Sequence, residues 1–352
     1  MASHASADGT DSDELIELDP RGDVILSILD HDKRHAGRVL CNSRVLELSS
    51  MVFARMFASN FKEGTAFRKQ DRPTIELQEQ YPQAMISLLS ALHFRNRKPT
   101  RAQEIGEVAI QADKFNCTEA LSRWAESESL DFLDPDLCEK FTVGDVGGLL
   151  LAATILKFRQ PYQLLEVALQ SLAPAVLPNA HDPLFGQVPD AIKHWLGSSV
   201  RDMLSSMQAQ VNISERYLRQ NQNYGTLYSN PHEPQKTCML CQTTVAFSQP
   251  TCLRCGCPRF AVPACTAATR LAKYFDSLER AGLWPSLDSH VSPMEYSNRI
   301  DKLRNDHDTC GGQKCPLTEA FERLRWACLE TLRARQISWN LVSTGLPVPD
   351  PW

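Results

Sequence analysis

The chain has 352 residues, of which 43% are hydrophobic and 22% are charged, a composition that can bury a core in two or three domains. The formal net charge of −5 argues against broad electrostatic binding to nucleic acid, which needs a basic face. No apolar run approaches the roughly 18 residues that a membrane span requires, and the polar, acidic start lacks the order of a signal peptide. We therefore expect a soluble intracellular protein, in the nucleus or cytoplasm, that does not contact membranes.

The beginning of the chain predicts a tail followed by a hairpin and short helices. Residues 1–20 are rich in serine and acidic side chains and are expected to be disordered. Residues 23–29 read as a strand, and residues 38–42 return as its hairpin partner. Ser43 is the expected N-cap of the next helix. A second short helix is expected to place four apolar side chains on one face: Val52, Phe53, Met56 and Phe57.

The next elements complete an α+β pattern. Residues 74–78 alternate between polar and apolar, as a strand does. Tyr81-Pro82 opens a helix, because proline is favoured in a first helical turn. Further helices are expected over residues 101–116 and 118–132. The first third of the chain is thus predicted to be a small, mostly three-stranded sheet capped by helices.

Beyond Pro135 only helices are expected, with a linker over residues 221–234. Three tryptophans at helical positions are expected to pack in a core: Trp124, Trp195 and Trp326. The helices are expected near residues 147–158, 162–176, 188–219, 266–283, 293–306 and 318–336.

Several segments occur in the order found in one known family. The predicted strand–turn–strand is followed by residues 40–64, which form a helical hairpin and a loop ending in Phe-Lys-Glu-Gly. Residues 91–94 and 109–117 match a hydrophobic helix and an Ala-Asp-Lys-aromatic helix end. Residues 21–133 therefore resemble a BTB/POZ domain. The whole chain also resembles fungal BTB proteins, which append helices and a cysteine-bearing tail with Gly-Leu-Trp-Pro, here at residues 282–285.

The resemblance implies a protein that acts by binding other proteins and not as an enzyme. In BTB adaptors of cullin-based ubiquitin ligases, a loop with a hydrophobic–x–Glu pattern faces the cullin. Phe61-Lys62-Glu63 matches this pattern, and Met56 and Phe57 would add apolar area. The absence of a predicted strand before the hairpin resembles the short form used by such adaptors. The alternative is that Phe61 is a core residue and Glu63 a solvated charge.

Six of the twelve cysteines crowd into residues 238–265. Two C-x2-C pairs separated by ten residues can supply the four thiolates of a tetrahedral structural zinc site, and the metal would stabilise a segment with few apolar residues. A loop of free thiols is the alternative. The expected ligands are Cys238, Cys241, Cys252 and Cys255, with Cys257, His307 and Cys310 as substitutes.

Two functions other than the adaptor role stay open. One is a BTB scaffold that self-associates and has no ligase role. The other is a transcription-linked regulator that contacts nucleic acid through the cysteine-rich segment.

The chain is expected to have five parts. These are a disordered tail (1–20), a BTB/POZ domain (21–133), a helical extension (134–222), a zinc-binding segment (232–262) and a C-terminal helical region (263–340).

Overall fold

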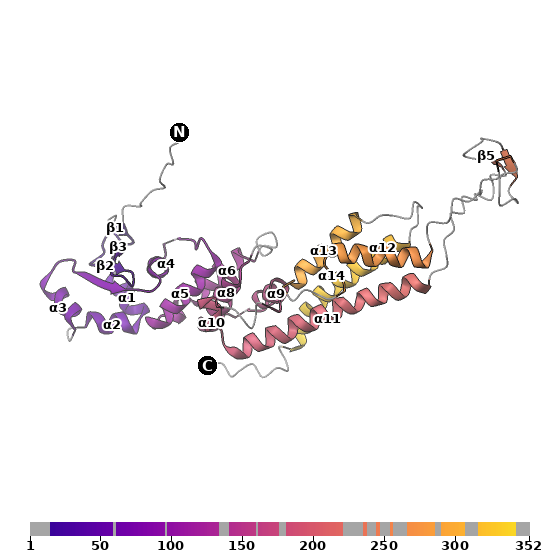
Figure 1. The fold of residues 1–352 in the computed structure, drawn as a ribbon. Helices are drawn as coiled ribbons and strands as arrows, with labels where there is room; N and C mark the ends of the chain where they lie inside the picture. Colours follow the sequence, from indigo (N-terminus) through magenta and orange to yellow (C-terminus); the bar gives the residue numbers. More distant parts are fainter. Residues whose placement is uncertain are drawn as a thin grey trace, which may run out of the picture. The chain divides into compact units, whose positions relative to one another are not determined.

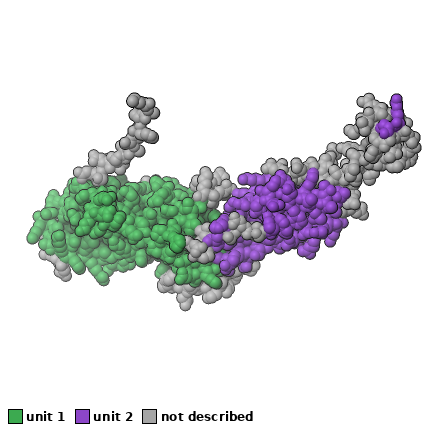
Figure 2. Space-filling model, viewed as in Figure 1, with its two compact units in different colours: residues 1–171, 176–196 green, residues 172–175, 197–352 purple. Residues whose placement is uncertain are grey.

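The chain folds into two compact units, which Figure 2 shows in different colours. Unit 1 comprises residues 1–171 and 176–196, and unit 2 comprises residues 172–175 and 197–352. No helix in the described part of the chain is long and apolar enough to cross a membrane. The computed structural model describes residues 15–58, 61–95, 97–133, 141–159, 161–175, 181–220, 235–237, 244–246, 254–255, 266–285, 290–306 and 316–342.

Unit 1 begins with a mixed four-stranded sheet in the order β1-β3-β2-β4 (Figure 1). Strand β2 is central: it pairs antiparallel with β3 and parallel with β4. Five of its six residues are buried, as expected for a strand that is covered on both faces. The strands are β1 (Leu15–Glu17), β2 (Val24–Leu29), β3 (His35–Cys41) and β4 (Thr74–Gln78).

The described part of unit 1 contains nine helices, and the sequence pattern predicts the positions of most of them. It also predicts strand β4. In β4, Ile75 and Leu77 are buried while their neighbours are exposed, which confirms the predicted alternation. Pro82 occupies the first turn of α4, also as predicted. The helices are α1 (Ser43–Ser49), α2 (Met51–Phe57), α3 (Lys62–Lys69), α4 (Pro82–Leu92), α5 (Ala102–Lys114), α6 (Thr118–Asp131), α8 (Val143–Ile155), α9 (Tyr162–Ser171) and α10 (Pro183–Gln187).

The start of the chain departs from the prediction. Residues 15–17 form β1, which pairs parallel with residues 38–40 of β3, so the expected disorder is wrong for these residues and the sheet has four strands instead of three. The expected absence of a strand before the hairpin, on which the likeness to the short adaptor form rested, is also wrong. The Leu18 side chain, directly after β1, is buried in the core. This strand is stabilised by a partner more than twenty residues away, which a local pattern does not reveal.

The first helix also begins one residue earlier than predicted. Asn42, not Ser43, is the N-cap of α1: its side chain accepts the backbone N–H of Arg44 at 3.1 Å. Both residue types are good caps. Ser43 is instead engaged by Asp23, whose carboxylate accepts its hydroxyl at 2.6 Å. The second helix is capped by Ser50, whose side chain accepts the N–H of Phe53.

Helices α5 and α8 approach closely through two glycines. A Cβ added to Gly106 would lie 2.5 Å from the Cα of Gly148 and 2.7 Å from its carbonyl oxygen. Helix α8 begins at Val143, four residues before the prediction, because Thr142 and Asp145 form a capping box there. Gly148 therefore lies inside α8 as a packing residue, and α8 belongs to unit 1 with α5.

Unit 2 is mostly helical but also contains a hairpin, so the expectation of helices alone beyond Pro135 is wrong. Tyr274 is fully buried, donates its hydroxyl to the carbonyl of Val211 at 3.1 Å, and contacts the tilted ring of Phe321 with ring centroids 5.3 Å apart. This residue joins three helices of the unit. The elements are α11 (Asp190–Gln220, whose first residues belong to unit 1), β5 (Gln235–Thr237), β6 (Thr244–Ala246), α12 (Ala267–Arg280), α13 (Pro293–Asp306) and α14 (Pro316–Val342).

The glycine contact between α5 and α8 predicts a sharp difference between two glycine-to-alanine substitutions. Gly106→Ala forces the two helix backbones apart and is expected to lower the free energy of unfolding by about 1–3 kcal/mol. Gly186→Ala, in α10, meets nothing within 4 Å and should be neutral or stabilising by up to about 1 kcal/mol. Urea denaturation of both variants measures this, and equal effects would contradict the close packing.

Candidate functional site

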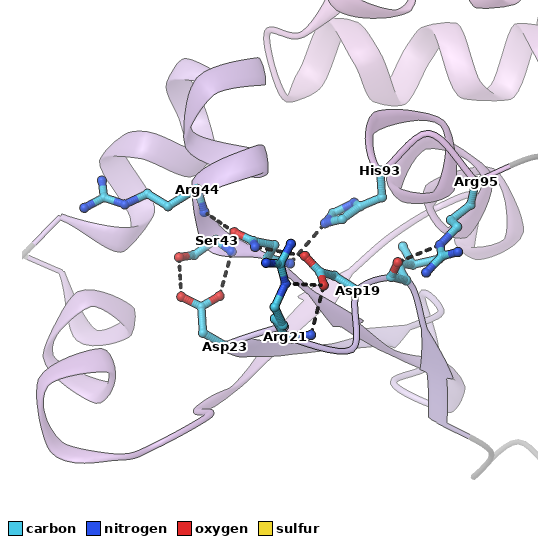
Figure 3. Close-up of polar contacts among 9 residues, drawn as sticks. Asp19, Arg21, Asp23, Ser43, Arg44, His93 and Arg95 are labelled. Atoms are coloured by element: carbon cyan, nitrogen blue, oxygen red, sulfur yellow. Dashed lines mark hydrogen bonds and ion pairs between the residues drawn. The ribbon is translucent and has the colours of Figure 1, made fainter.

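A polar network fixes the loop before β2 against the start of α1 (Figure 3). The Asp23 carboxylate accepts both the backbone N–H and the hydroxyl of Ser43, at 2.7 and 2.6 Å. The side-chain amide of Asn42 donates to Asp19 at 2.9 Å, and this hydrogen bond is the main cause that lowers the pKa of the Asp19 carboxyl. Charge-assisted hydrogen bonds of this kind are the stronger ones. The network therefore sets the direction in which the chain leaves the hairpin.

His93, at the end of α4, joins the same network. Its Nε2 accepts the backbone N–H of Asn42 at 3.0 Å, and its Nδ1 lies 2.8 Å from the carbonyl oxygen of Leu89, to which it donates. The two contacts require the neutral ring with its proton on Nδ1. Burial lowers the pKa of His93, against smaller opposing effects from the Leu89 carbonyl and Asp19. Nearby, Arg95 donates to the carbonyl of Leu18 at 2.7 Å.

An aromatic stack holds α2 and α3 in place. Phe53 stacks on Phe115, which ends α5, at a centroid distance of 4.8 Å, and on Phe57 at 5.7 Å. Phe57 in turn contacts Phe67 of α3 at 5.0 Å. Aromatic pairs at such distances stabilise beyond the area that they bury. The inner face of the α2–α3 segment is thus filled by four phenylalanine rings.

Phe61 is the N-cap residue of α3, and 52% of it is exposed. Its backbone N–H donates to the carbonyl of Ala58 at 3.3 Å, and its carbonyl accepts from the N–H and hydroxyl of Thr65, both at 3.0 Å. Glu63 is half-buried in the first turn of α3. Gly64 faces the same Ala58 carbonyl, and a Cβ there would lie 1.9 Å from its oxygen. The backbone around Phe61 is therefore closely defined.

The structure brings only part of the expected partner surface together. The alternative of Phe61 as a core residue is wrong, because this side chain is exposed. Phe57 is only 8% exposed, so it supports α3 from inside and adds no outer apolar area. Met56 is half-buried and packs against the core of unit 1.

Other apolar residues of unit 1 are exposed as well, among them Leu48, Met51 and Phe94. Leu48 and Met51 continue the helical spacing of the apolar residues after Ser43, so periodicity alone does not mark them as surface residues. Phe94 has a φ of 56°, in the left-handed region that few non-glycine residues adopt. Its sequence context, two residues after the last buried leucine of α4, was the available signal that the helix ends there.

Most of the expected zinc ligands lie outside the described residues: Cys238, Cys241, Cys252, Cys257, His307 and Cys310. Cys255 is described and exposed. The strands β5 and β6 pair antiparallel, with Thr237 opposite Thr244. In the sequence, the first C-x2-C pair lies between these two strands.

Elsewhere in unit 1, Asp30, His31 and Asp32 bring three side-chain ligand atoms within 4.8 Å of one another. His31 and Asp32 are exposed, and solvated charges around a hairpin turn are ordinary. We assign no site to this group.

The buried His93 ring predicts a dependence of stability on pH. Because its pKa is lowered from the ordinary value of 6.5, the folded chain binds fewer protons than the unfolded chain. The contribution of this ring is fully present above pH 6.5 and falls as the pH drops below it, by at most about 1.4 kcal/mol per pH unit. Asp19, which opposes this shift, and Arg95, which adds to it, are the charged groups that act on the ring.

Urea denaturation at about pH 7.5 and about pH 5.5 tests this dependence. The difference between the two pH values should be smaller in His93→Gln, whose side-chain oxygen can still accept the N–H of Asn42. An equal difference in wild type and variant would assign the pH dependence to other groups.

Comparisons with known proteins provide no relative for this chain. No family model matches it, and neither a curated protein nor a solved structure matches it. Its function must therefore be inferred from its own residues and their geometry.

Proposed function

We propose that this chain is a protein-interaction module of the BTB/POZ type that acts by binding, not by catalysis, and that it serves as a substrate adaptor by holding a cullin scaffold at Phe61-Lys62-Glu63. The observation that carries the proposal is the exposure of Phe61 beside Glu63 at the start of α3. In a free protein, an aromatic side chain held outside its own core is available to fill a partner's pocket.

The order of elements supports the BTB part of the proposal. A buried hairpin (β2–β3) leads into two short helices (α1 and α2), then the loop with Phe61, then a strand (β4) that pairs parallel with the first strand of the hairpin. This is the order of segments on which the resemblance rests. The helix ending at Leu92 and the helix over residues 102–114 come next, in the same order.

The local contacts of Phe61 support the binding role. The Phe61 backbone is hydrogen-bonded to Ala58 and Thr65, and Phe57 contacts Phe67 of α3. A partner would therefore lose little conformational entropy in ordering the segment. Glu63 adds a carboxylate that can meet a basic or amide group next to the pocket.

Binding of purified cullin N-terminal domains to the whole chain tests this proposal. We expect Phe61→Ala to weaken binding by roughly 30-fold or more, as removal of a central aromatic anchor does, and Glu63→Ala to weaken it less. Lys69→Ala, at the exposed far end of α3, is the matched control and should bind like wild type. Absence of binding by the folded wild type, or an unchanged affinity of Phe61→Ala, would refute the adaptor role.

We further propose that the cysteine-rich segment binds one structural zinc ion through Cys238, Cys241, Cys252 and Cys255. The pairing of β5 with β6 supports this, because it brings together the two strands that flank the first C-x2-C pair in the sequence. Thiolates suit zinc, and four of them leave no open position for water, so the ion would stabilise the segment without catalysing a reaction.

Metal analysis of the purified chain by mass spectrometry tests the zinc proposal. The wild type should hold about one zinc ion per chain, and Cys238→Ser or Cys252→Ser should lose most of it. Cys117→Ala removes a buried thiol in unit 1 and should keep the zinc. A metal-free wild type, purified without chelators, would contradict the site.

A further inference from the structure

The connection between α4 and α5 carries a run of positive charge that ends at a hydroxyl. Its described residues form neither helix nor strand, and Figure 1 shows the two helices that it joins. Thr100 is the one residue with a hydroxyl side chain in the sequence of this connection, and it is exposed. The basic residues around it are Arg95, Arg97, Lys98 and Arg101.

Two arginines precede Thr100 at the spacing that arginine-directed protein kinases recognise. Arg97 lies three residues before Thr100, and Arg95 lies five residues before it. Kinases select substrates partly by charge pattern, and those that require arginine place carboxylates along the groove that binds the substrate. Guanidinium groups form charge-assisted hydrogen bonds with such carboxylates. The sequence before Thr100 thus has the charge pattern of a kinase substrate.

Ser338 is preceded by arginines at the same two positions, but it lies in a different local structure. No other serine or threonine of the sequence has an arginine three residues before it. Because α14 continues to Val342, Ser338 lies within a helix. Kinase grooves bind extended segments, so α14 would have to open locally before Ser338 could react. The structure therefore distinguishes two residues that the sequence presents as equivalent.

The contacts of the two arginines can be replaced by a kinase. Arg97 donates to the side-chain oxygen of Gln83 at 3.1 Å, in an exposed contact. Arg95 donates through Nε to the carbonyl of Leu18 at 2.7 Å (Figure 3). Both acceptors are neutral, so a carboxylate in a kinase groove offers each arginine a stronger partner.

We propose that Thr100 is a phosphorylation site for an arginine-directed serine/threonine kinase, and that its phosphate breaks the link between Thr100 and Glu104. In the reaction, Oγ1 of Thr100 forms a bond to the γ-phosphorus of magnesium-bound ATP. The bond from that phosphorus to the bridging oxygen breaks, ADP leaves, and the hydroxyl proton passes to the catalytic aspartate of the kinase.

Glu104 connects Thr100 with α4 from inside the fold. Its Oε2 accepts the backbone N–H of Thr100 at 2.9 Å and the hydroxyl at 3.3 Å. Its Oε1 accepts the hydroxyl of Ser87 in α4 at 2.6 Å, and Glu104 is only 5% exposed. Phosphorylation removes the hydroxyl donor and places a charge of about −1.5 to −2 beside this carboxylate. Repulsion between like charges is strong where water is excluded, so the start of α5 is released.

The nearest cations described around Thr100 already have acidic partners. Lys98 lies 2.7 Å from Asp131, and Arg101 lies 3.5 Å from Glu107. Either cation would have to leave its carboxylate in order to neutralise the phosphate. The repulsion from Glu104 is therefore only partly offset, and we expect a net loss of order at the start of α5.

The site is tested on the full chain with magnesium ATP and the purified catalytic domain of an arginine-directed kinase. Mass spectrometry of the phosphopeptides should find phosphate on Thr100, with a rate roughly 10-fold or more above that of Ser338, because α14 must open first. Arg97→Ala should lower the Thr100 rate by about 10-fold or more, since it removes a charge-assisted contact. Arg123→Ala, an exposed arginine of α6 outside the motif, is the matched control and should react like wild type.

Three results would overturn the site. They are a chain that carries no phosphate on Thr100, a Thr100 rate that does not change in Arg97→Ala, and a folded chain in which Ser338 reacts faster than Thr100.

Amide hydrogen exchange of the full chain tests the effect on Glu104. Phosphorylation should speed the exchange of peptides that cover the start of α5, and by less in Glu104→Gln, whose side chain has no charge to repel the phosphate. The first turn of α5 has no side-chain cap, so slower exchange would mean that the phosphate caps the helix instead. That result, or an equal effect in wild type and Glu104→Gln, would contradict the proposed release.

Discussion

The rest of unit 1 depends on the position of β2 in the middle of the sheet. Its antiparallel neighbour β3 comes directly after it in the chain, but its parallel neighbour β4 lies on the other side. Strand β3 ends at Cys41 opposite Val24, and β4 begins at Thr74 opposite Ile25, so the chain from β3 to β4 leaves and re-enters the sheet at the same end, on either side of β2. Helices α1, α2 and α3 form this connection. Phe61 lies within it, and its location is therefore a consequence of the strand order.

The connection from β3 to β4 is tied to buried structure at two places by different interactions. At its beginning, Asp23 binds Ser43 with a charge-assisted pair of hydrogen bonds. Further along, Phe53 and Phe57 fix α2 and α3 against the end of α5. The polar contacts fix the direction in which the chain leaves the sheet, and the aromatic stack fixes α2 and α3 against the core. Phe61 takes no part in the stack and is exposed.

The sequence predicts an element correctly where a local pattern specifies it. Prediction fails where the element depends on contacts with residues far away in the chain. The alternation of residues 74–78 and the proline in the first turn of α4 are local signals, and each is sufficient to predict its element. Strand β1 has no such local signal, because it is a strand only through its pairing with Arg38–Leu40. Phe57 and Phe61 lie one helical turn apart in sequence, yet one is buried and one exposed, because α2 ends between them. Trp326 fits a helical period, but the buried face of α14 is satisfied without it.

Phe61 and Trp326 are exposed for a shared reason. Phe61 caps α3 and Trp326 lies on α14, and the inner faces of these helices carry other aromatic side chains, such as Phe67 in α3 and Phe321 in α14. Protein interiors are close-packed, so a core that is already filled by such side chains has no place for a further large ring. The exposure of both aromatics is therefore a consequence of the packing of the other side chains on their helices.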